Sequence, residues 1–443
     1  MKTENPPLKT AEIEIEGLTS AGDGVGKWRG LKVFVPGALP GETVKACLTQ
    51  IKKNYAHAVL LDITHAAATR LVPACPVYAA CGGCAFQHLA YEEQLKWKRQ
   101  WLSDALRRIG GLDIDALPTL PSPDTFFYRN RVQLHALWQN NQLKLGFYGR
   151  GSKAGEAIQS CLLMREPLNQ LMQSFTKLLL KTRTNMTGLQ HIALRCDSDG
   201  EQAMLILLGI PYNTALCQMA ERLMTEEPQL LSVWANWGRP IYGIYGDKWR
   251  KLAGADKLPE RLGNLKLDIS PAAFTQVNFT QALRLYECVA DYAALSGGKT
   301  LLDIYSGAGI IALNVARRVK QAIGVEEYAP AVADATRNAE LNGIVNCRFE
   351  AGRAEIILPR LARQGLKADV AVLDPPRAGC TAAVVEAVAA MQAQRVVYVS
   401  CDPATLARDL RLFAELGYTT HRAQPLDMFP QTGHVESICL LTG

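Results

Sequence analysis

The sequence lacks any long hydrophobic run. None of its apolar stretches approaches the ~18 residues that a membrane-spanning helix requires. Its first residues, 1–7, also lack the apolar segment of a secretory signal. A heptad repeat, the pattern that would predict a coiled-coil partner, is absent as well. We therefore expect a cytoplasmic protein that works as a monomer and has no membrane partner.

A strong charge of one sign is lacking too. Lys and Arg number 48 against 42 Asp and Glu, so the formal net charge of the 443 residues is only +6. A charge of this size is compatible with a polyanionic partner but does not demand one. Hydrophobic residues make up 48% of the chain, which is ordinary for a globular protein. The length predicts about two to three domains.

Cysteine, in contrast, is plentiful, with 12 residues. In a reducing compartment these do not form a disulfide framework, so their spacing indicates a metal, a cluster or catalysis. Cys75, Cys81 and Cys84 follow a C-x5-C-x2-C pattern, which lets a short loop wrap a metal centre. Cys161 is the candidate fourth ligand. Zinc and an iron-sulfur cluster both accept four thiolates, so the count leaves both open.

Residues 1–67 predict a small β-barrel. Short segments of alternating or β-branched residues are separated by glycine turns, a pattern typical of a closed barrel of the oligonucleotide-binding type. The expected strands are 12–16, 32–36, 44–51 and 57–63. One turn places Trp28 between Lys27 and Arg29, which suits base stacking and phosphate contact. A solvated loop with one buried Trp is the alternative.

Residues 68–268 predict an α+β domain that carries the cysteines. Residues 88–110 have helical spacing with apolar residues on one side, and we expect this helix to pack on the catalytic domain. Its other side is basic, and we expect that side to contact phosphate or solvent: Lys96, Lys98, Arg99, Arg107 and Arg108. Strands of a substrate platform are suggested by mixed aromatic and arginine segments and by apolar runs, at 126–131, 146–152, 192–195 and 203–208.

Residues 269–443 predict a doubly wound α/β domain. A buried strand, a turn with Gly307 and Gly309, and a helix start follow one another, which is the opening of a nucleoside-binding site. Asp303 ends the strand, where it would repel a pyrophosphate and attract the ammonium group of a ligand. Glu326 ends the next apolar segment, where an acid holds ribose hydroxyls. S-adenosylmethionine and NAD both carry such hydroxyls, so Glu326 alone does not discriminate between them.

Three further residues lie at predicted strand ends. Asp374 is followed by two prolines, which hold its carboxylate at the end of a strand. Cys401 follows an apolar strand at 395–399 and precedes a helix-like segment at 404–415. It is a candidate nucleophile, with a buried structural cysteine as the alternative. Glu436 offers a carboxylate ahead of the last strand. This order is that of a Rossmann-like methyltransferase sheet with seven strands.

Together these motifs resemble the RNA (uracil-5-)-methyltransferase family, in particular the branch that contains a [4Fe-4S] cluster and acts on 23S ribosomal RNA. The resemblance spans nearly the whole chain and rests on residues 274–278, 302–309, 326, 374–377, 400–403 and 434–436. It implies an N-terminal TRAM barrel and a central iron-sulfur domain. It also implies a C-terminal class I domain that uses S-adenosylmethionine as its methyl donor.

The same resemblance implies roles for individual residues. The [4Fe-4S] cluster would be held by Cys75, Cys81, Cys84 and Cys161. The methyl donor would be bound by Gln276, Tyr305, Gly307, Glu326 and Asp374. Cys401 would be the nucleophile and Glu436 the base. Ile310 and Arg353 depart from the family pattern at positions that contact the donor in other members.

The expected reaction is methylation of carbon 5 of a uridine in RNA, by the resemblance in 23S ribosomal RNA and not in DNA. Cys401 adds to carbon 6 to activate carbon 5, and Glu436 then removes the carbon 5 proton. The uridine must leave its stack, and the cluster is expected to be structural or to shape the RNA. The alternatives are a methyltransferase of the T-loop uridine in transfer RNA and a non-catalytic iron-sulfur RNA-binding protein.

Overall fold

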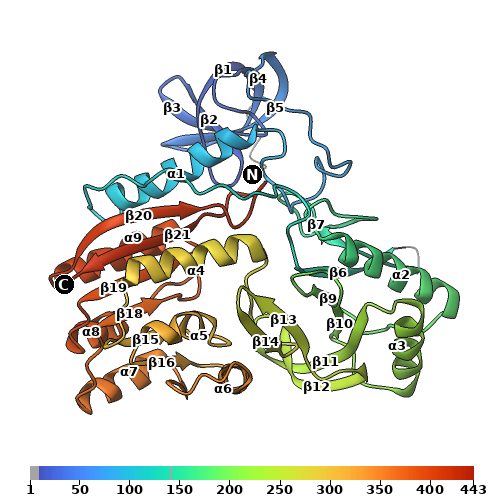
Figure 1. Ribbon diagram of the computed structural model, residues 1–443. Coiled ribbons are helices and arrows are strands. Elements are labelled where there is room, and N and C mark those ends of the chain that lie inside the picture. The colour runs from blue at the N-terminus through green and yellow to red at the C-terminus, as the bar shows by residue number, and fades with distance from the viewer. Residues whose placement is uncertain (1–8, 140–141) are drawn as a thin grey trace, which may run out of the picture.

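The computed structural model describes residues 9–139 and 142–443. In Figure 1 a closed barrel lies at the top, a 7-stranded sheet with the C-terminus lies at the left, and a second 7-stranded sheet lies at the right. This mixed α/β architecture with an N-terminal barrel confirms the predicted fold class.

The barrel closes in the strand order β1-β2-β3-β5-β4. Its strands are β1 (Lys9–Leu18), β2 (Asp23–Trp28), β3 (Leu31–Pro36), β4 (Thr43–Ile51) and β5 (Tyr55–His65). Alternate residues point inward, so Ile13, Ile15 and Val33 are buried while their neighbours meet solvent. Trp28 packs partly against this core, and the guanidinium of Arg29 lies 4.9 Å from the centre of its ring.

The second sheet has the order β12-β11-β10-β9-β6-β7-β8. Its strands are β6 (Arg131–Gln139), β7 (Gln142–Tyr148), β8 (Gly155–Ala157), β9 (His191–Cys196), β10 (Ala203–Leu208), β11 (Leu230–Tyr242) and β12 (Tyr245–Gly254). Helices α2 (Glu166–Thr182) and α3 (Thr214–Glu226) cover one face, where their leucines pack with every second strand residue. The apolar runs predicted as strands at 192–195 and 203–208 form β9 and β10.

Helix α1 (Tyr91–Arg108) lies between the barrel and the C-terminal sheet (Figure 1). It buries Leu102 and Leu106 in the core of that sheet. The prediction that Lys98 belongs to an exposed basic side is wrong, because Lys98 is fully buried and forms an ion pair with the fully buried Asp427. A buried charge is tolerated when it is paired, and this partner lies 329 residues further along the chain.

The C-terminal sheet has the order β17-β16-β15-β18-β19-β21-β20. Its strands are β15 (Thr300–Ile304), β16 (Gln321–Glu326), β17 (Cys347–Ala351), β18 (Val370–Leu373), β19 (Arg395–Ser400), β20 (Thr419–Leu426) and β21 (Glu436–Thr442). Strands β15 to β19 are parallel, and β21 runs antiparallel between β19 and β20. The predicted methyltransferase sheet with seven strands is confirmed.

Helices cover both faces of this sheet. They are α4 (Phe279–Ala293), α5 (Ile310–Val315), α6 (Ala329–Leu341), α7 (Ala354–Arg363), α8 (Ala382–Ala390) and α9 (Pro403–Glu415), with a short 3-10 turn at Ala316–Arg318. One face is covered by α4, α5 and α6, and the other by α1, α7, α8 and α9. The hairpin of β13 (Leu258–Leu262) and β14 (Leu265–Ile269) also packs into this core. Among the described helices, none has the length and apolar character needed to cross a membrane.

Candidate active site

The strand order of the C-terminal sheet reverses between β15 and β18, which is where open α/β sheets bind their ligands. In the turn between β15 and α5, Tyr305, Gly307 and Gly309 have φ angles of +66°, +53° and +79°. Glycine is required at 309 because a Cβ there would lie 2.7 Å from the ring of Phe349. This turn therefore brings bare backbone to the ligand edge of the sheet.

Two carboxylates border the turn. One oxygen of the buried Asp303 accepts a hydrogen bond from the N–H of Ala312 at 3.0 Å, and the other has no hydrogen-bond partner among the described residues. Burial raises the pKa of Asp303 to about 7. Glu326 accepts hydrogen bonds from the N–H groups of Gly307 at 3.0 Å and Tyr328 at 2.7 Å. These bonds fix Glu326 at the sheet edge, where its remaining lone pairs can accept hydrogen bonds from hydroxyl groups.

A second pair of carboxylates follows the central strands. Asp374 comes directly after β18, and Glu436 opens β21 with only 2% of its surface exposed. Burial raises the pKa of Asp374 to about 7. Burial and then the charge of Asp374 raise the pKa of Glu436 well above its usual range. A nearby cation would therefore lower the pKa of both carboxyls and favour their ionised forms.

Cys401 follows the last residue of β19. Ser400 pairs with Ser437 across β19 and β21. The next residues along these strands, Cys401 and Glu436, therefore come opposite each other. The thiol is partly exposed, and burial followed by the Glu436 charge raises its pKa to about 11, while the guanidinium of Arg377 opposes this rise. An accessible thiol thus lies beside a buried carboxylate.

The backbone around this thiol is fixed by a helix cap. The side chain of Asp402 accepts hydrogen bonds from the N–H groups of Ala404 and Thr405, each at 2.9 Å, and so caps α9. The N–H of Asp402 donates to the Ser400 hydroxyl at 3.1 Å. The chain therefore turns sharply from β19 into α9, which leaves Cys401 at the corner.

The other predicted donor-binding residues lie on two sides of the turn. Gln276 and Ile310 line a small pocket with Tyr286. Burial raises the pKa of Tyr286, and the charges of nearby carboxylates, of which Asp374 has the largest effect, raise it further. Tyr286 therefore lies near these carboxylates as well as at the pocket. Tyr305 is partly buried on the other face of the sheet. Ile310, which departs from the family pattern, therefore lies next to Gln276.

Arg353, the second departure, lies at the start of α7 and is 3.6 Å from Glu355 in an exposed ion pair. Sequence reasoning missed two other residues. Tyr286 gave no signal, because its helical spacing is that of an ordinary core residue. Arg377 belongs to the motif at 374–377, but only the structure reveals its influence on Cys401.

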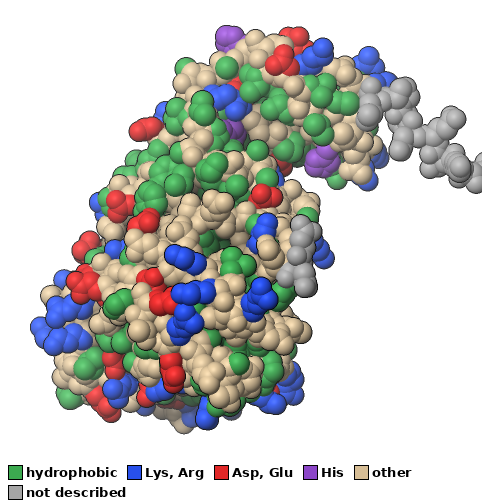
Figure 2. Space-filling model, turned by 90° about the vertical axis from the view of Figure 1, so that its right-hand side faces the viewer, with side chains coloured by type: hydrophobic (Ala, Val, Ile, Leu, Met, Phe, Trp, Pro, Cys, Tyr) green, Lys and Arg blue, Asp and Glu red, His purple; other side chains and the backbone are tan. Residues whose placement is uncertain are grey.

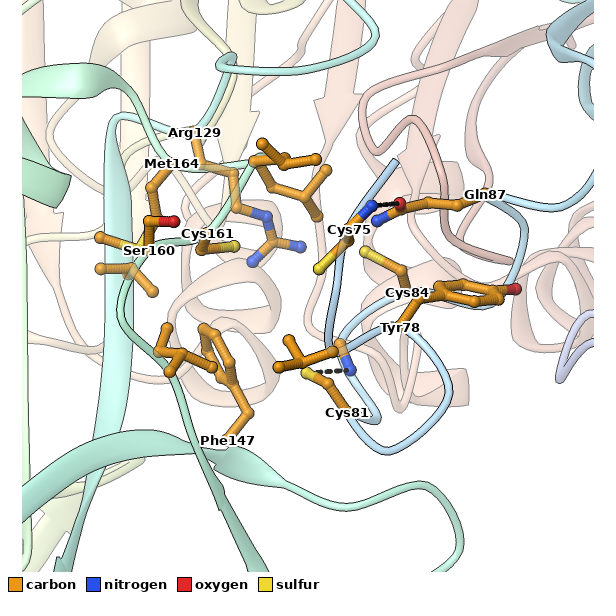
Figure 3. Close-up of a pocket in the computed structure, with 16 residues that line it drawn as sticks. Cys75, Tyr78, Cys81, Cys84, Gln87, Arg129, Phe147, Ser160, Cys161 and Met164 are labelled. Atoms are coloured by element: carbon orange, nitrogen blue, oxygen red, sulfur yellow. Dashed lines mark hydrogen bonds between the residues drawn. The ribbon is translucent and has the colours of Figure 1, made fainter. Parts of the chain in front are cut away.

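A separate cavity lies among four cysteines (Figure 3). Cys75, Cys81 and Cys84 come from one loop, and Cys161 approaches from the segment after β8. Together they line a cavity of about 50 Å³. The N–H of Gly83 donates to the sulfur of Cys81 at 3.4 Å. The structure thus brings all four predicted ligand residues to one cavity.

The walls of this cavity are mostly apolar, with residues such as Val77, Phe147 and Met164. Burial raises the pKa of Cys84 to about 12, so this thiol is neutral unless a cation binds. The described part of the chain contains no group of three or more His, Cys, Asp or Glu side chains close enough to hold one metal ion. The four thiols surround a space instead of converging on a point.

The doubly wound sheet, the glycine turn and the acids at its switch point define the fold of a class I S-adenosylmethionine-dependent methyltransferase. Residues 261–443 match the family model described as tRNA (Uracil-5-)-methyltransferase, and residues 8–61 match the TRAM domain. An RNA methyltransferase of Listeria innocua is 36% identical over 98% of both chains. One of Clostridium tetani is 37% identical over 100% of this chain and 98% of its own.

Among solved structures, the tRNA (uracil-54, C5)-methyltransferase of Pyrococcus abyssi in complex with S-adenosyl-L-homocysteine is similar. It is 25% identical, covers 98% of this chain and 100% of its own, and gives a TM-score of 0.75. The chain belongs to the tRNA (uracil-5-)-methyltransferase family, with a TRAM domain added. It is an S-adenosylmethionine-dependent RNA methyltransferase for carbon 5 of uracil. The predictions of family, enzyme class and methyl donor are confirmed.

Proposed function

We propose that the enzyme methylates a uridine of 23S ribosomal RNA through a covalent bond between Cys401 and carbon 6 of the base. The observation that carries the mechanism is the partly exposed Cys401 thiol opposite the buried Glu436 carboxylate at the ligand edge. The choice of ribosomal RNA rests on the four-cysteine cavity, through the family branch that the sequence resembles. Transfer RNA is the second candidate, because the Pyrococcus neighbour is a tRNA methyltransferase.

The reaction begins when the Cys401 thiolate adds to carbon 6, which turns the ring into an enolate. Arg377 favours this thiolate, because its charge opposes the effect of burial on the thiol pKa. The donor would supply an electrophilic methyl group bound to a sulfonium sulfur. When the methyl–sulfur bond breaks, the sulfur keeps the bonding electrons and the rest of the donor leaves as a neutral thioether. Carbon 5 forms the new bond to that methyl. The Glu436 carboxylate then takes the carbon 5 proton, the C–H electrons restore the double bond, and the Cys401 sulfur is expelled.

The donor site fits a cationic nucleoside. The free oxygen of Asp303 and the raised pKa of Asp374 both favour a neighbouring positive charge, such as the ammonium or sulfonium of the donor. Glu326 is fixed by two N–H groups and would accept the ribose hydroxyls. Gln276, Tyr305 and Gly307 complete the proposed set, with Gly307 in the turn between them.

The four-cysteine cavity is proposed to hold a [4Fe-4S] cluster. The four thiols border a cavity of about 50 Å³, and a cationic metal centre in it would lower the raised pKa of Cys84. The choice of an iron-sulfur cluster over zinc rests on the family branch that the sequence resembles. Iron and sulfide analysis with a visible absorption spectrum tests this assignment.

RNA contact is proposed along the barrel and the central sheet. The face of β6, β7 and β9 away from α2 and α3 carries His135, Tyr148 and His191, with ring centres of His135 3.8 Å from Tyr148 and 4.8 Å from His191. Tyr148 is 48% exposed, and an exposed aromatic ring suits stacking with a base. Lys144 lies on the same strand and face and is exposed, where it suits a phosphate. Figure 2 shows Lys and Arg side chains grouped below the barrel.

The division into domains follows from these roles. We propose an RNA-binding barrel to residue 67, a central domain with the cluster, and a catalytic domain that includes the β13–β14 hairpin, because the hairpin packs in the catalytic core. The enzyme is proposed to act as a cytoplasmic monomer.

Mass mapping of 5-methyluridine in ribosomal and transfer RNA, from cells with and without the protein, tests the target. Loss of one modified uridine from 23S RNA supports the proposal, and loss from the T-loop instead replaces it with the transfer-RNA alternative. Incubation with RNA that carries 5-fluorouridine tests the mechanism. A denaturation-resistant adduct is expected with the donor present, since fluorine cannot leave as a proton does.

A further inference from the structure

The segment 427–435 connects β20 to β21, whose first residue is Glu436. Most of it is buried, although it is neither helix nor strand. Several of its side-chain and backbone groups are bonded to residues that precede them by 302 positions or more. The placement of Glu436 therefore depends on distant parts of the chain.

Helix α1 supplies the first set of contacts. The ammonium of Lys98 forms the buried ion pair with Asp427 and donates to the carbonyl of Phe429 at 3.0 Å. One turn earlier, the side-chain amide of Gln94 donates to the side-chain oxygen of Gln431 at 3.1 Å. The oxygen of that same Gln94 amide accepts from the backbone N–H of Gln431 at 3.1 Å. The two glutamines thus form a reciprocal pair.

The cysteine loop supplies the second set. The backbone N–H groups of Ala85 and Phe86 both donate to the carbonyl of Gln431, at 2.9 and 3.1 Å. Gln94 also donates to the carbonyl of Phe86 at 3.1 Å. Cys84 directly precedes Ala85, so the loop that lines the four-cysteine cavity is bonded to the segment that carries Glu436.

Gln431 itself has a strained backbone. Its φ is +69°, and it is 5% exposed. A left-handed conformation is unfavourable for a residue other than glycine, and such strain persists where surrounding contacts enforce it. Nearby, a Cβ at Gly433 would clash with the backbone of Ser20 in the barrel turn. Three parts of the chain therefore meet this segment.

We infer that Gln431 is a positioning residue that holds Glu436 in place for proton removal, by bonding its segment to α1 and to the cysteine loop. This inference rests on the proposed role of Glu436 as the base. Gln431 does not touch the reacting atoms. Its bonds to Gln94, Ala85 and Phe86 set the path of the chain, and displacement of Glu436 by about 1 Å is enough to slow its reaction roughly tenfold to hundredfold.

The two halves of the reaction separate this role from a general structural one. Addition of Cys401 and methyl transfer do not need Glu436, whereas release of the product does. A displaced Glu436 therefore leaves adduct formation intact and slows elimination. On ordinary RNA with the donor present, the methylated adduct should then accumulate in a denaturation-resistant form.

The experiment uses the full-length enzyme with Gln431→Gly and Gln94→Ala. Gln431→Gly removes the bond between the two side chains, keeps the bonds of the Gln431 backbone, and accepts the positive φ. Gln424→Ala is the matched control, because Gln424 is 8% exposed in β20 and its side chain donates to the carbonyls of Pro118 and Pro425, which both lie outside the segment. Substrates are a uridine RNA and its 5-fluorouridine analogue.

We expect both test variants to trap 5-fluorouridine RNA within about twofold of the wild-type rate, and to turn over uridine RNA roughly tenfold to hundredfold more slowly with accumulated adduct. Gln424→Ala should behave like the wild type. The inference is overturned if turnover is unchanged, or if trapping falls in parallel with turnover. It is also overturned if both variants fail to fold while Gln424→Ala folds. If the wild type itself traps no 5-fluorouridine RNA, the proposed function fails instead.

Discussion

Cys401 and the four-cysteine cavity are two regions in which burial has the same effect on a thiol but the surrounding groups differ. Burial raises the thiol pKa in both, to about 11 at Cys401 and about 12 at Cys84. Cys84 has other thiols and apolar walls around it in a four-cysteine cavity. Cys401 lies near the carboxylates of Glu436 and Asp374 and the guanidinium of Arg377. Both Cys84 and Cys401 are partly exposed, so burial and exposure do not distinguish the proposed ligand thiol from the proposed nucleophile, whereas the neighbouring charged groups do.

Replacing one thiol from each region tests this difference most strongly. Cys401→Ala should lower methyl transfer by about 10⁴-fold or more, because no other thiol can form the adduct, while the iron content stays unchanged. Cys84→Ser should instead remove the iron of the proposed cluster. Methyl transfer, adduct formation and iron content are measured for both variants. Unaltered methyl transfer by Cys401→Ala would favour the non-catalytic alternative.

The iron-depleted protein adds a readout that does not depend on activity. Because the cysteine loop is bonded to Gln431, hydrogen exchange of the amides in 427–436 should rise when the proposed cluster is removed. Exchange in the barrel strands serves as the control. Unchanged exchange in 427–436 would show that the two thiol regions are independent.

Glu436→Gln changes the region of Cys401 and leaves the four-cysteine cavity as it is. Loss of the base should slow product release by roughly 10²- to 10⁴-fold while the thiol still adds to RNA. A denaturation-resistant complex with ordinary uridine RNA is expected on gels. If the variant releases product at the normal rate, another group removes the proton.

The central sheet, which borders the four-cysteine cavity, offers a paired test of RNA contact. Tyr148 and Trp138 are similarly exposed, at 48% and 50%. The register places them on opposite faces, because Trp138 pairs with Leu143, which packs towards α2 and α3. Tyr148→Ala should weaken RNA binding by about 1–3 kcal/mol, roughly 5- to 150-fold in Kd. Trp138→Ala should change it little, and equal losses would contradict a one-sided platform.

The smallest effect is expected from Arg377→Gln. The charge of Arg377 opposes the rise in the pKa of both Cys401 and Glu436, so its removal should raise both values. Because the reaction needs both groups deprotonated, the acid limb of the kcat/KM profile should move to higher pH. Arg348→Gln, at an exposed arginine paired with Glu350, should leave the profile in place. An acid limb that moves to lower pH would contradict the assigned electrostatics.

Much of the fold was predictable because local patterns carry it. Parallel strands of continuous apolar residues and the turn with Gly307 and Gly309 fixed the type of sheet and its ligand edge. The four cysteines were predicted to lie together, and the structure places them at one cavity. The roles assigned to Cys401 and Glu436 stay predictions, which the experiments above test.

What the sequence did not reveal depends on contacts between distant segments. Lys98 fits the basic side of an amphipathic helix, and nothing local indicates that Asp427 would meet it in the core. Gln431 carries no signal for its left-handed backbone, since that conformation is enforced by Gln94 and the cysteine loop. Tyr286 resembles any core residue of a helix. Pairings of this kind arise only when the whole chain is folded.

The antiparallel strand β21 sits between β19 and β20 although it is the last of the three in the chain. During synthesis its neighbours therefore emerge from the ribosome first, and the native order of the sheet is complete only when β21 takes the place between them. Glu436 comes opposite the thiol at the corner of β19 only through the pairing of β21 with β19. If Glu436 is the base, assembly of the proposed pair is thus a late event in the maturation of the enzyme, because a nascent chain that has not reached β21 lacks this carboxylate.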